Sequence, residues 1–196
     1  MRAYLRPAVT LLAGLTILTG VAYPALVTGL SQALFPDRAA GSFVMQNGAA
    51  VGSRLIGQPF SDVGHFRGRP SATTPTPYNA AASGGSDLGP SNPLLADSFS
   101  ARAERLRAAD PSNTAPIPVD LLTASASGLD PDISPAAAAY QAPRVARLRG
   151  IAMDTLQQIV AAHTTGRFLG LFGEPRVNVL LLNLALDSAV VARSTR

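Results

Sequence analysis

The longest uncharged hydrophobic segment lies near the start of the chain. Residues 7–35 contain no charged side chain, whereas Arg2 and Arg6 precede them and Asp37 follows. About 20 apolar residues at roughly 1.5 Å each cross the ~30 Å hydrocarbon core of a bilayer. The pattern therefore predicts one transmembrane helix. The alternative is a cleaved signal peptide, whose apolar region is shorter, about 7–15 residues.

The charges that flank this segment predict its orientation. Because positive residues stay on the cytoplasmic side, Arg2 and Arg6 place residues 1–6 in the cytoplasm. Residues 7–35 then form the transmembrane helix, and residues 36–196 form an extracytoplasmic domain. The predicted location is the inner (plasma) membrane, with a single pass through the lipid bilayer.

Small residues repeat along one side of the predicted helix. Ala25, Gly29 and Ala33 are spaced four apart and therefore share a face. Such rows let transmembrane helices approach closely, which indicates a partner helix in the membrane; a lone lipid-facing anchor is the alternative. Pro24 removes one backbone hydrogen bond and is expected to kink the span.

The outer region begins with a hairpin pattern and a long loop. Residues 41–46 and 49–56 flank Asn47-Gly48, the dipeptide typical of a tight β-hairpin turn. Residues 67–93 are dense in Gly, Pro, Ser and Asn, which predicts a long loop. A loop of this length in a compact domain is usually functional or disordered.

Helix signals follow the loop. Asn92 and Pro93 provide a cap and a first turn for a helix that continues over residues 94–109. Residues 119–125 are expected to form a short strand or turn. Ser134-Pro135 opens another helix, which Pro143 is expected to break in two.

The last part of the chain predicts one more helix and a strand. Residues 151–164 are amphipathic, and their helix is expected to begin near Asp154. Residues 176–186 are rich in Val and Leu and predict a buried central strand. The order of elements indicates a small α/β or α+β domain attached to a single membrane helix.

Composition excludes several kinds of chemistry. The chain has no Cys, and its sixteen basic residues are all Arg. Without Lys there is no P-loop and no Schiff-base chemistry, and without Cys there is no thiolate nucleophile. The net charge of +4 includes no arginine run with interleaved aromatic residues, so nucleic-acid binding is not expected.

Candidate catalytic residues are sparse. His65 and His163 are far apart and lack the H-E-x-x-H spacing, so neither a metal site nor a catalytic role is predicted for them. The segment Ser83, Gly84, Gly85 and Ser86 could turn its N–H groups toward an anion, as a weak nucleotide candidate. A plain Gly-Ser turn is the alternative.

Several arginines are candidates for interaction or structural roles. Arg69 in "GRPSA" could clamp a carboxylate, either to order its own loop or to dock it onto a partner; a solvated arginine is the alternative. Arg144, Arg147 and Arg149 could form one basic face or a solvated one. Arg176, at the start of the apolar segment, is a further candidate.

The stretch "SGLDPDIS" at residues 127–134 holds two carboxylates. Asp130 and Asp132 lack the additional ligands of a calcium loop. A structural role is favoured: Asp130 would bond the loop backbone before Pro131, and Asp132 would lie near the helix that Ser134 caps. A metal or acid–base pair is the less favoured alternative.

Six sequence blocks in a fixed order resemble one protein family. They are "GQPF", "GRPSAT", "NAAASGGSDLGPSNP", "PVDLLTASASGLDPDISPAAA", "QAPRVARLRG" and "GLFGEPRVNVLLLNLAL". Together with the single predicted span, they resemble KdpC, one of the subunits of the bacterial Kdp potassium-transporting ATPase. The family usually has aromatic residues where this chain has His65 and Arg67, and its residue at the position of Asp132 varies.

The resemblance implies a place in a multi-subunit complex. In that complex a potassium-channel-like subunit carries K⁺, a P-type ATPase subunit hydrolyses ATP, and a small one-helix subunit completes the assembly. KdpC itself is not catalytic; it is expected to stabilise the complex, and a chaperone-like role that raises the ATP affinity of the ATPase subunit is also implied. ATP as a ligand conflicts with the predicted topology, because ATP is cytoplasmic and the domain is outside.

Two other classes of protein compete with this interpretation. A membrane-anchored envelope hydrolase would use Asp130 and Asp132. A binding protein released by signal cleavage would lack the membrane helix altogether.

Overall fold

The computed structural model describes residues 2–194, and the chain divides into two compact units, Met1–Val51 and Gly52–Arg196. The two units are described separately. Met1, Thr195 and Arg196, at the ends of the predicted regions 1–6 and 36–196, lie outside the described residues. The side chain of Arg2, on which the predicted orientation partly depends, also lies outside them.

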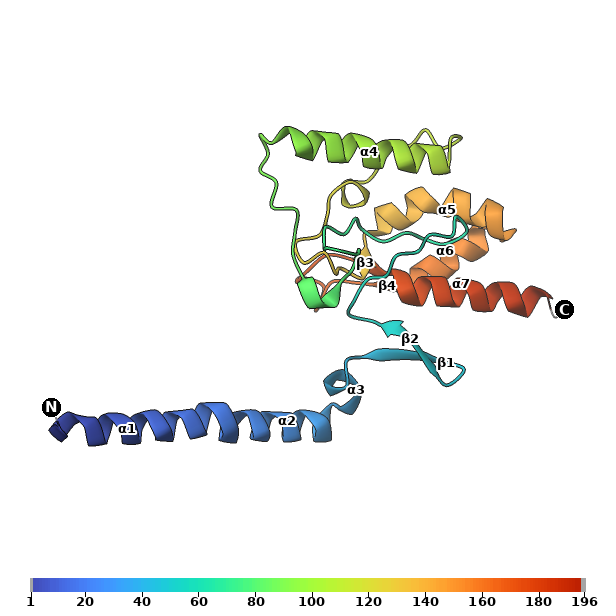
Figure 1. Ribbon diagram of the computed structural model, residues 1–196. Helices are drawn as coiled ribbons and strands as arrows, with labels where there is room; N and C mark the ends of the chain where they lie inside the picture. The colour runs from blue at the N-terminus through green and yellow to red at the C-terminus, as the bar shows by residue number, and fades with distance from the viewer. Residues whose placement is uncertain (1, 195–196) are drawn as a thin grey trace. The chain divides into compact units, whose positions relative to one another are not determined.

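The first unit is dominated by one long apolar helix (Figure 1). It comprises α1 (Arg2–Ile17), the π-helical turn η1 (Leu18–Ala22) and α2 (Tyr23–Leu34). The span Tyr4–Leu34 is 31 residues long, and none of its apolar window is buried within the chain. Length and composition therefore suffice for the predicted membrane crossing.

Pro24, in the middle of this helix, is accommodated by the π turn. Pro24 has no N–H, and its ring would clash with the carbonyl four residues earlier in a regular α-helix. Directly before it, the Tyr23 N–H bonds to the Leu18 carbonyl, five residues back. The wider turn keeps the helix continuous, in line with the usual association of π-bulges with irregular points in helices.

The first unit ends in the predicted hairpin. A short helix, α3 (Pro36–Ala39), leads into β1 (Phe43–Gln46) and β2 (Ala49–Ser53), which pair as a two-stranded sheet. Asn47 and Gly48 have φ angles of 51° and 81°. These positive values are the backbone conformation that an Asn-Gly turn supplies, so the hairpin prediction is confirmed.

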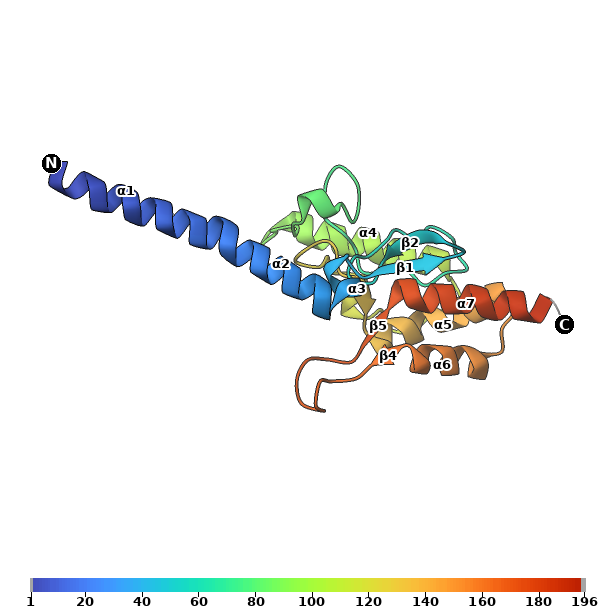
Figure 2. The ribbon, with the colours of Figure 1, turned by 90° about the horizontal axis from the view of Figure 1, so that it is seen from below.

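The second unit is a mixed domain built on a small antiparallel sheet and three helices. The sheet has the order β3-β5-β4, formed by β3 (Asp132–Ile133), β5 (Arg176–Asn178) and β4 (Thr164–Thr165). Helices α5 (Pro135–Arg149), α6 (Met153–Ala162) and α7 (Val179–Ser194) pack beside it, as Figure 2 shows. The largest fully buried apolar side chains are Phe66, Ile133, Val145, Leu156, Val177, Leu182 and Leu186.

The remaining elements flank this core, to which they add the buried Leu121 and the partly buried Leu106. Loop 67–93 contains only the short 3₁₀ turn η2 (Ala80–Ala82), which confirms the predicted long loop. Helix α4 (Pro93–Ala109) follows, and the Asn92 side chain accepts a hydrogen bond from the Leu94 N–H at 3.0 Å, as a capping residue does. Residues 119–125 hold the 3₁₀ turn η3 (Val119–Leu121) and no strand.

The predicted break at Pro143 is wrong. Helix α5 begins at the predicted cap, where Ser134 Oγ accepts the Ala137 N–H at 3.0 Å, and it continues past Pro143 to Arg149. Residues on both sides of the proline, including Ala142 and Arg144, are buried. Tertiary packing of this face offsets the single backbone hydrogen bond that Pro143 removes.

The predicted strand at residues 176–186 is wrong beyond its first three residues. Strand β5 ends at Asn178, whose side chain accepts the Leu181 N–H at 3.1 Å and so supports the first turn of α7. The buried residues then recur at helical spacing: Val179, Leu182, Asn183 and Leu186. A short apolar run fits a buried strand or a buried helix equally well, and here the spacing of three and four decides for the helix.

Candidate functional sites

A polar cleft of about 320 Å³ is lined by four of the candidate interaction or structural residues that the sequence identified. Arg69, Asp130, Ser134 and Arg176 line it together with Asp120, Asp132 and Glu174. The four candidates come from the long loop, from the turn before β3, from the cap of α5 and from the first residue of β5. These residues are up to 107 positions apart in the sequence (176 − 69).

The centre of the cleft is an ion pair between two loops. Arg69 Nη1 lies 3.0 Å from Asp130 Oδ2, and both side chains are about a quarter to a third exposed. The second terminal nitrogen of Arg69 donates to Thr123 Oγ1 at 3.3 Å. Arg69 therefore orders its own loop internally, which is one of the roles that the sequence predicted.

Tight backbone packing fixes this junction from the other side. The Tyr78 hydroxyl donates to the Arg69 carbonyl at 2.5 Å, and the Gly57 N–H donates to the Leu129 carbonyl at 2.8 Å. A Cβ at Gly57 would lie 2.4 Å from the Tyr78 ring, so only glycine fits there. Burial, together with the charge of Asp130, raises the pKa of Tyr78 to about 12 and keeps the phenol neutral.

The carboxylates of "SGLDPDIS" are occupied by contacts within the chain. Asp130 Oδ1 accepts the Asp132 N–H at 3.0 Å, which forms the turn expected of an Asp before Pro. Asp132 in turn contacts Arg176 Nε at 3.0 Å and the Asn178 amide at 3.1 Å. Burial raises the pKa of Asp132 above its usual value, and hydrogen bonding from Asn178 opposes the shift. These contacts join strand β3 to β5.

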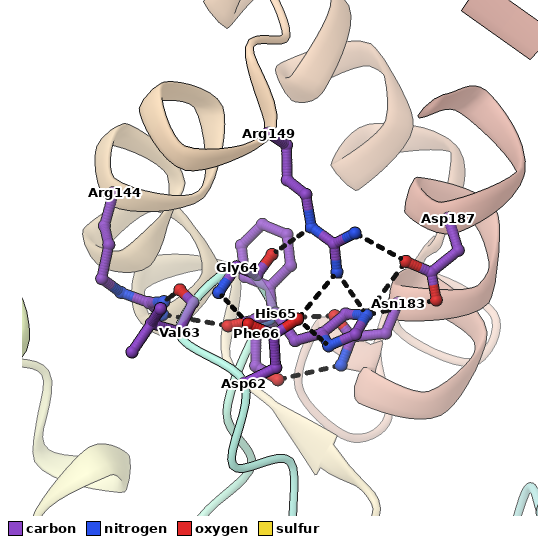
Figure 3. Close-up of polar contacts among 9 residues, drawn as sticks. All are labelled: Asp62, Val63, Gly64, His65, Phe66, Arg144, Arg149, Asn183 and Asp187. Atoms are coloured by element: carbon purple, nitrogen blue, oxygen red, sulfur yellow. Dashed lines mark hydrogen bonds and ion pairs between the residues drawn. The ribbon is translucent and has the colours of Figure 1, made fainter. Parts of the chain in front are cut away.

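A second cluster, absent from the sequence predictions as a unit, surrounds the segment 62–66 (Figure 3). Arg144 is 4% exposed and donates to the backbone carbonyls of Val63 and His65, the latter at 3.1 Å. The Arg144 guanidinium thus fixes the segment 62–66 to α5 through hydrogen bonds to its backbone carbonyls. Burial lowers the pKa of Arg144, and the nearby charge of Arg67 acts in the same direction.

Arg149 and His65 meet two carboxylates in the same cluster. His65 Nε2 lies 3.0 Å from Asp187 Oδ1, and its Nδ1 lies 3.3 Å from Asp62 Oδ2. Arg149 contacts the same two carboxylates at 3.1 and 3.3 Å and donates to the Gly64 carbonyl at 2.9 Å. The cluster joins α5, α7 and the loop before Phe66 (Figure 3).

Two buried amides complete the attachment of this loop. Asn183 accepts the Phe66 N–H and donates to the Phe66 carbonyl, both at 2.9 Å. Gln141 does the same for Arg67, at 2.9 and 3.0 Å. Each side-chain amide supplies one donor and one acceptor, as the backbone of a neighbouring strand would. The buried N–H and carbonyl groups of the loop are thereby paired.

Arg144, Arg147 and Arg149 do not form one basic face, which was one of the two interpretations of these residues, the other being a solvated face. Arg144 is buried, Arg147 pairs with the buried Asp110 at 2.7 Å, and Arg149 turns toward Asp187. The three side chains therefore serve three different contacts. Asp187 and Asn183 were missed because they lie in or just after a segment taken for a strand; their spacing of four was the available signal.

The weak nucleotide candidate is bonded to the start of the "SGLDPDIS" segment, and the second histidine bonds back to its own helix. The Gly84 N–H and the Ser83 hydroxyl both donate to the Ser127 carbonyl, at 2.9 and 3.0 Å. His163 Nδ1 lies 2.8 Å from the Ile159 carbonyl, one helical turn earlier. Among residues 2–194, no group of three or more His, Asp or Glu side chains is placed to hold a metal ion.

Two apolar surfaces lack a partner within the described chain. Ala25, Gly29 and Ala33 are exposed along the long apolar helix, and nothing lies within 4 Å of a Cβ built on Gly29. The second surface is the segment 166–174 between β4 and β5, here called the apolar finger, which extends away from the sheet in Figure 2. Its large side chains are 64–76% exposed: Phe168, Leu169, Leu171 and Phe172.

The finger is held in a defined shape. Phe168 and Phe172 form a β-bridge across it, with backbone N–O distances of 2.8 and 2.9 Å. Arg167 and Glu174 pair at its base at 2.8 Å. The apolar tip is therefore preorganised, and the two charges of the finger neutralise each other.

Comparison with known proteins agrees with this combination of an apolar helix and a small mixed domain. A family model described as "KdpC: K+-transporting ATPase, c chain" matches residues 5–188. A potassium-transporting ATPase KdpC subunit from Variovorax paradoxus (strain S110) is 64% identical over 193 residues, covering 98% of this chain and 100% of the relative. The KdpC subunit of Sorangium cellulosum (strain So ce56) is 61% identical over 189 residues, covering 96% and 100% of the two chains.

These matches establish the kind of protein and then its family. The chain is a subunit of a potassium-transporting ATPase, and within residues 2–194 it has one helix long and apolar enough to cross a membrane. It belongs to the KdpC family, the c chain of that ATPase, and the resemblance given by the six sequence blocks is confirmed.

Proposed function

We propose that this chain is the membrane-anchored, non-catalytic subunit of a high-affinity, ATP-driven potassium uptake complex and that it stabilises the assembly. In this proposal residues 1–6 face the cytoplasm, residues 7–35 cross the inner membrane and residues 36–196 lie outside. The partners are the potassium-channel-like subunit, the P-type ATPase subunit and the small one-helix subunit of the Kdp complex.

One observation carries the proposal: both units of the chain expose apolar surface that they do not bury themselves. In the finger, four large side chains are 64–76% exposed. Fully burying such a side chain is worth about 1.5–3 kcal/mol. Scaled by the exposed fraction of these four, covering them is worth roughly 4–8 kcal/mol before the costs of association. A contact of this size contributes measurably to holding a subunit in a complex.

The chemistry of the finger favours a protein as its partner. No charged side chain lies between Arg167 and Glu174, and these two already pair with each other. A loop that binds an anionic lipid surface usually carries free basic residues at its rim. We therefore assign the finger to an apolar groove on the outer surface of the channel-like subunit.

The membrane helix supplies the second contact of the proposal. The row Ala25, Gly29 and Ala33 lets another helix approach closely. Any effect of this chain on the ATP affinity of the ATPase subunit is then transmitted through this helix, because ATP is on the opposite side of the membrane from residues 36–196.

The test is a variant of the finger that keeps its backbone shape. Leu169 has a φ of 52°, which Asn tolerates well, so Leu169→Asn combined with Leu171→Ser removes apolar surface without forcing a new turn. The complex is purified in mild detergent, and the amount of this chain that accompanies the channel-like and ATPase subunits is measured. We expect at least tenfold less, with poorer growth at limiting K⁺.

The matched control is Leu148→Gln, at a residue that is 50% exposed on α5 and distant in sequence from the finger. It should leave assembly unchanged. Wild-type assembly of the finger variant, or purification of the wild-type chain without any multi-spanning partner, would contradict the proposal. A hydrolase that uses Asp130 and Asp132 predicts instead that replacing both by Asn abolishes a reaction while assembly persists.

A further inference from the structure

Four arginines line one cavity that neither cluster described above explains. The cavity has a volume of about 320 Å³ and lies between α4 and loop 67–93. Arg67 and Arg69 reach it from the loop, and Arg102 and Arg105 reach it from the helix. Ser71 and Tyr78 complete its polar lining, and no carboxylate is among the residues that line it.

Most of this positive charge has no acidic partner. Among the ion pairs of the described residues, only Arg69 of these four arginines has one, to Asp130. Arg102 donates to the Leu122 carbonyl at 2.6 Å and Arg105 to the Ala101 carbonyl at 3.2 Å. These bonds hold the guanidinium groups in place and leave their charge uncompensated.

Arg102 shows the electrostatic cost of gathering like charges here. Burial lowers the pKa of Arg102, and the neighbouring charge of Arg105 lowers it further. Positive groups that gather in a concave site with apolar walls, here Leu106 and Leu121, focus a positive potential there. An anion in the cavity would relieve this repulsion and accept hydrogen bonds from the guanidinium N–H groups that have no partner within residues 2–194.

We infer that this cavity is a binding site for a phosphate group. Guanidinium groups approach from a loop on one side and a helix on the other, which suits a ligand with acceptor oxygens in several directions. A tetrahedral phosphate has such oxygens and up to two negative charges, whereas a planar carboxylate has one charge and two oxygens. The inference does not depend on the assembly role proposed above.

Two sources could supply this chemistry: free inorganic phosphate and the phosphate of a lipid headgroup. The first experiment titrates the full chain, in a neutral phosphate-free detergent, with inorganic phosphate and follows binding by calorimetry. The second uses native mass spectrometry of the chain released from nanodiscs that contain phosphatidic acid or phosphatidylcholine. Saturation by inorganic phosphate identifies a free anion, and selective retention of phosphatidic acid alone identifies a headgroup.

The variants are chosen from both walls of the cavity. Arg105→Gln and Arg67→Gln each remove one charge without breaking an ion pair in the described chain, and each should weaken binding at least tenfold. Arg107→Gln is the matched control, because Arg107 is exposed on the same helix and does not line the cavity. It should bind like the wild type, and circular dichroism should be the same for all three.

Three results would each overturn the inference. The first is that neither inorganic phosphate nor phosphatidic acid binds saturably. The second is that Arg107→Gln weakens binding as much as Arg105→Gln, which would show a diffuse effect of net charge. Equal displacement of bound phosphate by acetate at the same concentration would also reject a phosphate-selective site.

Discussion

The buried amide of Asn183 provides the most direct test of how the outer domain is held together. Its side chain is 1% exposed, and its two polar atoms pair with the N–H and carbonyl of the fully buried Phe66. Asn183→Ala removes both partners and leaves two buried backbone groups unsatisfied. Each such group costs about 1–3 kcal/mol, so the unit should lose roughly 2–6 kcal/mol.

The measurement is thermal unfolding of the full chain in a neutral detergent, followed by circular dichroism. For a unit of this size the midpoint shifts by roughly 2–4 °C per kcal/mol, so we expect a fall of about 4–24 °C. Asn92→Ala is the control, because it removes an exposed helix cap worth about 1 kcal/mol. A midpoint for Asn183→Ala no lower than that of the control would refute the reasoning.

A second substitution at the same position separates hydrogen bonding from packing. Asn183→Asp keeps the size of the side chain and the acceptor for the Phe66 N–H. At neutral pH, however, it places a buried carboxylate oxygen against the Phe66 carbonyl, which is strongly unfavourable. Protonation restores a donor, so the loss of stability relative to wild type should be smaller at pH 4 than at pH 7.

Two further predictions follow from other contacts. Gly57→Ala places a Cβ 2.4 Å from the Tyr78 ring, and overpacking of this kind costs about 1–3 kcal/mol, which the same melting experiment should detect. For Asp110, burial by itself raises the pKa, but hydrogen bonds from Arg147 and Ser112 hold it below the usual 3.8. Its contribution to stability is therefore present above pH 3.8 and is lost as the pH falls through the lower folded pKa. In melts between pH 2 and 6, Asp110→Asn should show a weaker loss toward acid than wild type, and parallel curves would contradict this assignment.

Local signals made several elements predictable from the sequence. The uncharged run at residues 7–35, the Asn-Gly hairpin turn, and the caps at Asn92 and Ser134 depend on chemistry within a few residues. All four correspond to elements of the structure, with small differences in their ends. The amphipathic helix at residues 151–164 is confirmed as well, beginning at Met153, next to the predicted Asp154.

Elements that depend on their surroundings were not predictable in the same way. Pro143 lies inside a continuous helix because the buried faces around it offset one missing hydrogen bond. The apolar segment at residues 176–186 becomes a helix after Asn178, since its buried face packs against the rest of the core. Propensity and composition are weak guides where tertiary contacts supply most of the free energy.

The amino-acid sequence was enough to establish the long apolar helix, the mixed character of the outer region, the lack of lysine and cysteine chemistry, and the resemblance to the KdpC family. Which side chains meet is a property of the folded chain. Arg69 and Asp130 are 61 positions apart, and His65 and Asp187 are 122 apart. No local pattern encodes such pairs, because they form only when the core brings distant segments together. The same holds for the four arginines around the proposed phosphate site, which come from a loop and a helix some 35 residues apart (102 − 67).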